Sequence, residues 1–416
     1  MLSMPRGEQP IADYLCRPMD MKVSAKTDRF QAHDYYMVDE LLSEEHLLAR
    51  AAVREWVRQE VTPIIEDYAE RAECPTQLFA GLAEIGAFGP SLPVEYGGGG
   101  MDEIAYGVIM QELERGDSGV RSMASVQGSL VMYPIFRYAS EEQKRKYLPK
   151  LGKGEFIGCF GLTEPDYGSN PAGMISTIRD DGDAYVLNGA KMWITNSPIA
   201  DLAVVWAKDE QGDIRGLVVE AGTKGYSAPG IHGKWSLRAS ITGELIFEDV
   251  RVPKSQVFPE VKGLRGPLSC LSKARYGIAW GAIGAAMDCY DSALRYAKER
   301  IQFDKPLAAF QLTQKKLAEM ITEITKAQLL AWRLGTLANA GKATPAQISM
   351  AKRNNVAIAL DIAREARQIH GGMGITNEYP IMRHMMNLET VLTYEGTHEI
   401  HLLVTGHDVT GINAFS

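Results

Sequence analysis

The segment Thr393-Tyr394-Glu395-Gly396-Thr397-His398 contains the residues of this chain best suited to acid–base chemistry. Its carboxylate, Glu395, follows an apolar run that ends at Leu392, so we expect that part of its surface is removed from water. Loss of hydration raises the pKa of a carboxyl group toward the range useful for proton abstraction. Gly396 allows the backbone to adopt a positive φ or to approach a ligand closely. The segment therefore predicts a general base, although a Glu beside a Gly is also an ordinary end of a loop.

An arginine in an apolar region is the second candidate. Arg121 follows Glu114 by seven residues and is itself followed by Ser122 and Ser125. A guanidinium can bind a carboxylate through two parallel hydrogen bonds, and the serine hydroxyls can complete the set. The alternative is a structural ion pair between Arg121 and Glu114, and the sequence leaves both interpretations open.

Two segments offer groups that a flat heterocycle such as a flavin requires. Residues 160–169 (FGLTEPDYGS) combine hydroxyls, glycines and backbone amides for the polar edges of a ring, and Trp193-Ile194-Thr195 adds an indole face. An ordinary turn followed by a buried strand tryptophan is the alternative.

A possible diphosphate clamp lies further along the chain. Arg300 and Gln311 flank the junction of two predicted helices, and Gly371-Gly372 would allow another backbone to approach the same phosphates. Neither a GxGxxG after a strand nor a GxxxxGKS is present, so Rossmann and P-loop binding are not expected. No convincing acidic or cysteine ligand set accompanies His398 and His401, so we assign no metal.

Composition restricts the class of protein. The 416 residues suffice for two or three domains, and 44 Lys and Arg against 52 Asp and Glu give a net charge of −8. No attraction to nucleic acid and no stable membrane insertion is expected. Five scattered cysteines without a CxxC pair fit a reducing compartment.

The sequence predicts where the protein acts. The first 30 residues contain Asp13, Asp20 and Asp28 and no apolar stretch typical of a secretion signal. These acidic residues favour the bacterial cytoplasm, with the mitochondrial matrix as the alternative for a eukaryotic protein.

Hydrophobic periodicity predicts the order helical, β, helical. Leu48, Ala52 and Trp56 are spaced as on a helix, and Ser140 to Gln143 form a capping box. Between about 158 and 252, short β-branched runs separated by Gly, Asn and Asp favour an antiparallel barrel or sandwich. Long helices follow at 275–302, 311–340 and 345–369. The predicted parts are an N-terminal extension (1–35), a helical domain (36–155), a β-domain (156–262) and a C-terminal helical domain (263–416).

Taken together, these residues resemble the acyl-CoA dehydrogenase family, and within it the glutaryl-CoA dehydrogenases. The resemblance covers about residues 36 to 415 and depends on several motifs in the right order. It implies an α+β protein with a middle antiparallel β-barrel, a C-terminal four-helix bundle, FAD as cofactor and a homotetramer. The motifs are GCFGLTEP (158–165), KMWITNS (191–197), ARYGIAWG (274–281), RIQF (300–303), GGMG (371–374) and TYEGT (393–397).

Roles are implied by the resemblance for individual residues. Glu395 would remove the α-proton of an acyl thioester while the β-hydride passes to the flavin, with the thioester oxygen polarised partly by the Glu395 backbone N–H. Arg300 and Gln311 would act from the adjacent subunit. Implied substrate contacts are Glu114, Arg121, Ser122, Ser125, Ser169, Leu268, Arg275, Tyr394 and Gly396. Implied FAD contacts are Phe160, Leu162, Thr163, Ser169, Trp193, Ile194, Thr195, Arg300, Phe303, Gln311, Gln368, Gly371, Gly372, Thr397 and Phe415.

Arg121 restricts the range of implied substrates. A plain acyl tail would leave a buried guanidinium unpaired, whereas the distal carboxylate of glutaryl-CoA would pair with it. The resemblance implies oxidation and decarboxylation to crotonyl-CoA in lysine, tryptophan and aromatic degradation, with an electron-transferring flavoprotein as acceptor. Asn170, where the motif commonly has Asp, puts FAD affinity in question. The alternatives are a short-chain acyl-CoA dehydrogenase or oxidase and a non-catalytic acyl-CoA-binding homologue.

Overall fold

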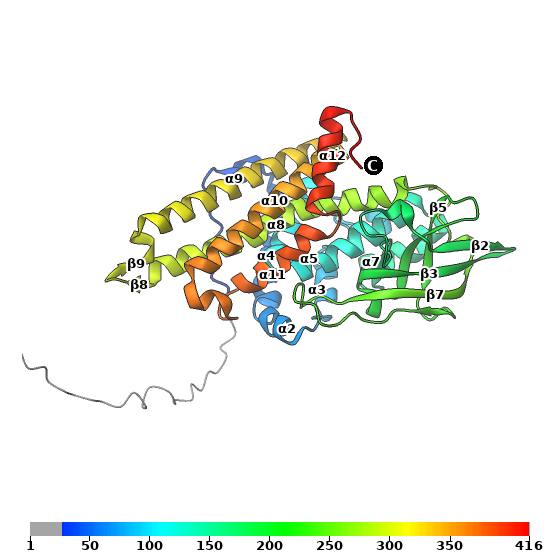
Figure 1. Ribbon diagram of the computed structural model, residues 1–416, viewed down its shortest axis with the longest axis horizontal. Coiled ribbons are helices and arrows are strands. Elements are labelled where there is room, and N and C mark those ends of the chain that lie inside the picture. Colours follow the sequence, from blue (N-terminus) through cyan, green and yellow to red (C-terminus); the bar gives the residue numbers. More distant parts are fainter. Residues whose placement is uncertain (1–26, 416) are drawn as a thin grey trace, which may run out of the picture.

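The computed structural model describes residues 27–415, so that Cys16 and most of the expected N-terminal extension lie outside the described residues. Figure 1 shows helical parts at the beginning and end of the chain and a β-domain between them, which confirms the predicted order. No helix within 27–415 is long and apolar enough to cross a membrane.

The N-terminal part is a set of short helices. The predicted capping box is confirmed: the Ser140 hydroxyl accepts from the Gln143 backbone N–H, and the Gln143 side chain accepts from the Ser140 N–H. Such a cap stabilises a helix start by about 1 kcal/mol. The helices are α1 (Glu44–Trp56), α2 (Ile65–Arg71), α3 (Leu78–Glu84), α4 (Glu103–Gly116), α5 (Ser118–Ser125), α6 (Tyr133–Tyr138) and α7 (Glu141–Gly152), with π-helical turns η3 (Val57–Val61) and η5 (Val126–Met132).

The middle part is a seven-stranded sheet whose apolar side chains form their own core. The predicted β-runs all lie in strands. Successive side chains point to opposite faces, so Ala203 and Val205 belong to this core while Val204 and Trp206 join the core of the helical parts. The strands are β1 (Gly158–Gly161), β2 (Thr177–Asp181), β3 (Ala184–Thr195), β4 (Leu202–Lys208), β5 (Ile214–Glu220), β6 (Tyr226–Ser227) and β7 (Thr242–Pro253).

The expectation of an antiparallel β-domain is confirmed for most strand pairs and wrong at two places. β1 runs parallel to β4 along its whole length, and β2 meets the end of β4 in parallel at Thr177 and Lys208. The long connection through β2 and β3 returns the chain to β1 in the same direction, which a short hairpin cannot do. The other pairs are antiparallel.

The C-terminal part is a helical bundle formed by long helices, with α12 as a fifth helix packed on α10. The bounds predicted for its first helix are wrong: α8 begins ten residues earlier because Pro267 is accommodated in the first helical turn, and it ends before a small turn. The elements are α8 (Arg265–Glu299), β8 (Ile301–Gln302), β9 (Lys305–Pro306), α9 (Gln311–Asn339), α10 (Pro345–Ile369), α11 (Ile381–Thr393) and α12 (His398–Thr410).

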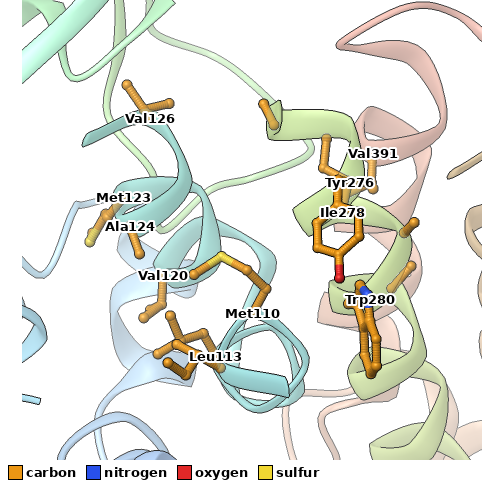
Figure 2. Packing of buried hydrophobic residues seen from close by; sticks show 14 of the residues in the cluster. Met110, Leu113, Val120, Met123, Ala124, Val126, Tyr276, Ile278, Trp280 and Val391 are labelled. Carbon is orange, nitrogen blue, oxygen red and sulfur yellow. The ribbon is translucent and has the colours of Figure 1, made fainter. Parts of the chain in front are cut away.

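Helix α8 is buried along most of its length and joins the two helical parts through α4 and α10. Figure 2 shows Met110 and Leu113 of α4 on one side and Ile278 and Trp280 of α8 on the other. Val391, near the end of α11, belongs to the same apolar cluster. The core therefore fixes α11, and the loop that follows it, against α8 and α10.

Candidate active site

The predicted base lies in a sharp turn between α11 and α12. Glu395 has a φ of +56° and Gly396 a φ of +96°, so two consecutive residues are in the region that favours glycine. A Cβ at Gly396 would lie 3.0 Å from the ring of His401. The backbone N–H of Glu395 donates no hydrogen bond within the described residues and remains available to a ligand.

Cations surround this turn. The Arg275 Nε of α8 donates to the carbonyl oxygen of Glu395 at 2.5 Å. Burial raises the pKa of the Glu395 carboxyl to about 7, although Arg275, Arg121 and Lys352 each act in the opposite direction. One carboxyl oxygen is buried and has no hydrogen-bond partner in the part of the chain that is described. Glu395 thus has the proton affinity and the free oxygen that a general base requires.

Arg121 lies on α5 at the centre of a buried polar cluster. Its Nε donates to a Glu114 oxygen at 2.8 Å, and an Nη donates to the Tyr394 hydroxyl. Glu114 accepts a second hydrogen bond from the Ser118 hydroxyl at 2.9 Å. Gly281 of α8 lies so close to this carboxylate that any side chain at position 281 would overlap with Glu114. Burial opposes the charge of Arg121, but Glu114 and Tyr394 raise its pKa, so the guanidinium stays charged.

The expectation that a plain acyl tail would leave Arg121 unpaired is therefore wrong. Glu114 already compensates the charge, as in the alternative interpretation of the sequence, a structural ion pair between Arg121 and Glu114. The Nη1 group of Arg121 nevertheless has no hydrogen-bond acceptor in the described chain, and it carries two N–H donors. Ser122 and Ser125 are buried on the same helix. The cluster can therefore both balance its own charge and offer donors to a further anion.

A second set of buried polar side chains holds α11, which precedes Glu395, against α5, which carries Arg121. Asp117, which caps the start of α5, accepts hydrogen bonds from Arg383 at 2.7 Å and from Asn387 at 2.8 Å, both on α11. Arg383 also binds Glu66 at 2.9 Å. Because α11 leads directly to Glu395 and α5 carries Arg121, Asp117 fixes the separation of the two candidate groups.

The first group of predicted cofactor contacts lies at the edge of the β-domain. Trp193 lies at a bulge of β3 with a φ of +62°, and 58% of its surface is exposed. Such a strained, exposed indole is costly unless a ligand covers it. The neighbouring loop is rigid, because buried Glu164 binds Lys191 at 2.8 Å and accepts two backbone N–H groups. Phe160, Leu162 and Ile194 are buried, Thr163 and Thr195 are half-buried, and Ser169 and Asn170 are exposed.

The second group lies at the opposite end of the molecule, beside β8 and β9 (Figure 1). Arg300 follows the last residue of α8, Gln311 begins α9, and Gln368 receives a hydrogen bond from Lys316 at 2.8 Å. One chain thus does not bring the two groups together, and a single cofactor could contact both only across a subunit boundary. Phe303 is 86% exposed, and Arg300, Gln311, Gln368, Gly371 and Gly372 are also exposed.

The remaining predicted residues lie around the turn that carries Glu395 or beyond α12. Thr397 caps the start of α12 with its side chain. Leu268 lies in the first turn of α8 and is 38% exposed. Phe415 lies beyond α12 and is exposed.

Sequence reasoning missed several residues of this site: Lys352, His401, Asp117, Arg383 and Asn387. One signal was present for Lys352, because it interrupts an apolar stripe of α10 that includes Val356 and Ala363 at helical spacing. Asp117 had only the general signature of a helix cap, and its partners lie more than 260 residues away.

Comparison with protein families follows the three structural parts. The descriptions "Acyl-CoA dehydrogenase, N-terminal domain", "middle domain" and "C-terminal domain" match residues 43–155, 159–250 and 261–409.

Individual proteins are similar along nearly the whole chain. Glutaryl-CoA dehydrogenase from Mycobacterium smegmatis is 50% identical, with a TM-score of 0.91 over 93% of this chain and 100% of that one. A structure of a glutaryl-CoA dehydrogenase from Mycobacterium smegmatis in complex with FADH2 is also 50% identical and gives a TM-score of 0.90 over 91% of this chain and 97% of that one. The 3-(aryl)acrylate reductase of Clostridium sporogenes is 36% identical over 87% of this chain and 97% of its own length. The human short-chain specific acyl-CoA dehydrogenase, a mitochondrial protein, is 35% identical over 91% and 93%.

Proposed function

The chain belongs to the acyl-CoA dehydrogenase family, and we propose that it is a decarboxylating glutaryl-CoA dehydrogenase. It is an FAD-dependent acyl-CoA dehydrogenase, as members of this family are. The substrate, the decarboxylation and the roles of individual residues form the proposal. The observation that carries it is the buried Arg121 beside Glu395, with donors free to receive a carboxylate.

Glu395 is the proposed base. An acyl thioester placed over the turn would present its α-carbon to the free carboxyl oxygen and its carbonyl oxygen to the Glu395 N–H. A hydrogen bond to that oxygen stabilises the enolate that forms as the α-proton leaves. FAD supplies the acceptor for the β-hydride, and Trp193 with the loop 160–169 would hold its ring. Arg275, by binding the carbonyl oxygen of Glu395, keeps the carboxyl group directed at the substrate.

Arg121 is the proposed anchor for the distal carboxylate. Its Nη1 would donate to the substrate, while Glu114 and Tyr394 hold the guanidinium in place. An uncharged tail would have to cover these donors without satisfying them, which disfavours it.

Decarboxylation would follow oxidation at the same site. In the resulting unsaturated acid, the electrons of the breaking C–C bond pass into a dienolate conjugated with the thioester, and CO2 leaves. Glu395, now protonated, would return its proton to the γ-carbon to give crotonyl-CoA. Tyr394 remains protonated, because burial raises its pKa, and its hydroxyl can therefore take part in hydrogen bonding to Arg121 throughout.

The two separated groups of cofactor residues support a homo-oligomer, for which we propose a tetramer. We also propose an electron-transferring flavoprotein as the acceptor, a role in lysine, tryptophan and aromatic degradation, and the bacterial cytoplasm, or the mitochondrial matrix in a eukaryote, as the location.

A short-chain acyl-CoA dehydrogenase is the second candidate. The ion pair of Arg121 with Glu114 is complete without substrate, so an uncharged acyl group leaves no net charge uncompensated. The similarity to short-chain acyl-CoA dehydrogenases supports the same alternative.

The test is anaerobic mixing of the purified holoenzyme with glutaryl-CoA and, separately, with butyryl-CoA. Flavin bleaching reports oxidation, and mass analysis identifies the product. Bleaching by glutaryl-CoA with crotonyl-CoA formed is the expected result. Glutaconyl-CoA instead would refute decarboxylation, and bleaching by butyryl-CoA alone would favour the second candidate.

A further inference from the structure

Lys352 is a buried cation that the proposed chemistry does not use. It lies on α10, is 1% exposed, and donates to the carbonyl oxygens of Tyr394 at 3.0 Å and Gly396 at 3.1 Å. A third carbonyl, that of Leu392, lies at 3.4 Å. The three N–H donors of the ammonium group are thus all directed at the backbone around Glu395.

The turn that Lys352 binds requires such support. An L-residue in the left-handed region costs roughly 1–2 kcal/mol, and strained backbone persists only where its surroundings hold it. Arg275 binds the Glu395 carbonyl from α8, while Lys352 binds the carbonyls on both sides from α10. The three consecutive carbonyls of residues 394–396 therefore all accept hydrogen bonds from cations.

The charge of Lys352 has no carboxylate in direct contact within the described chain, and its acceptors are neutral carbonyls. Burial lowers the pKa of its ammonium group to about 7, and Glu395 is the largest influence in the opposite direction. The other charged or titratable groups that act on the pair share the buried site around the turn. They are Arg275 and Cys270 of α8, Arg121 of α5, Glu114 of α4, His401 of α12 and Tyr394 next to Glu395. Burial lowers the pKa of His401 to about 3, so it is neutral here.

We propose that Lys352 is a positioning residue for Glu395: its hydrogen bonds fix the left-handed turn, and its charge favours the ionised carboxylate before substrate arrives. This inference deepens the proposed function and rests on the role of Glu395 as base. Part of the basicity of Glu395 would then depend on a side chain of α10 that donates to the backbone of residues 394 and 396.

The test compares Lys352→Met, which removes donors and charge at similar length, with Lys352→Gln, which keeps two donors. The control is Lys234→Met in the middle domain. Lys234 is half-buried and likewise donates to backbone carbonyls, those of Leu237 at 3.1 Å and Ser240 at 2.6 Å. If one replacement does not give folded holoenzyme, the other carries the test.

The readout is the rate of flavin reduction by glutaryl-CoA between pH 6.5 and 9. Loss of the charge should raise the pKa of Glu395 by about one unit, which lowers the rate at pH 6.5 about ten-fold. The Met and native rates should converge within about three-fold at pH 9, where Lys352 itself is neutral in the native protein. KM should change little, and Lys234→Met should keep the native profile.

A substrate-free readout accompanies the rates. Infrared titration of the holoenzyme follows the protonated carboxyl band that is absent from Glu395→Gln, and this band should persist to higher pH in both Lys352 variants. A native titration, or a rate loss equal at every pH, overturns the inference. Glu395→Gln that reduces flavin at the native rate would instead refute the base, and with it the proposed function.

Discussion

Replacing Arg121 by methionine tests what determines the substrate. The replacement removes the proposed donors, but it also leaves the fully buried carboxylate of Glu114 without its cation. An uncompensated buried charge lowers the free energy of unfolding by about 3–5 kcal/mol. The single variant therefore cannot separate a change in substrate specificity from a loss of folded protein. The double variant Arg121→Met/Glu114→Gln removes both charges at similar volume, which is often close to neutral for stability.

The size of the effect follows from the hydrogen bonds lost. Hydrogen bonds to a charged group contribute about 1.5–3 kcal/mol each, and Nη1 offers two donors. The loss for glutaryl-CoA is therefore at least about 3 kcal/mol, or about 100-fold in kcat/KM at 1.4 kcal/mol per factor of ten. Butyryl-CoA makes none of these bonds, so its kcat/KM should stay the same or increase.

The assay is the ratio of kcat/KM for glutaryl-CoA and butyryl-CoA, with an artificial electron acceptor and the thermal midpoint measured in parallel. The double variant should have a native midpoint and a ratio reduced about 100-fold. A stable double variant with an unchanged ratio would show that Arg121 is only a structural partner of Glu114.

Four further predictions follow from the site. Glu395→Gln should keep the yellow cofactor and reduce flavin about 10² to 10⁴ times more slowly; a spectrum and a stopped-flow trace are enough, and native-like reduction would remove the base. Because the pKa of Glu395 lies at about 7 and its ionised form is the active one, the native reduction rate should rise from pH 6 to 8 and then level, whereas a rate that falls over this range would contradict the sign. Trp193→Ala should fold normally but bind FAD about five-fold more weakly, since aromatic stacking contributes roughly 1 kcal/mol; unchanged affinity on reconstitution would exclude the stacking role. Asp117→Asn keeps the helix cap but removes a charge partner of buried Arg383, and should lower unfolding free energy by about 1–3 kcal/mol in denaturant titration; native stability would mean that Glu66 alone suffices.

The sequence alone determined features that depend on neighbouring residues or on an unusual residue type in its surroundings. The apolar spacing of α9 and α10 and the capping box at Ser140 depend on neighbouring residues, so they could be predicted from those residues. Glu395 and Arg121 were identifiable because a lone carboxylate beside a glycine and a lone guanidinium in apolar surroundings are chemically unusual. Hydrophobic periodicity also predicted the order of the helical and β parts, and the family resemblance added the cofactor.

Tertiary structure decided what each of these groups can do. The ion pair with Glu114, one of the two interpretations that the sequence left open, balances the charge of Arg121, and the Tyr394 hydroxyl, 273 residues away, accepts a further hydrogen bond from it. The left-handed turn at Glu395 and the hydrogen bonds of Lys352 exist only because α8 and α10 pack around that loop. Desolvation and ion pairing depend on which distant segments surround a group. The proton affinity of Glu395 is therefore set by the tertiary structure, while its presence is set by the sequence.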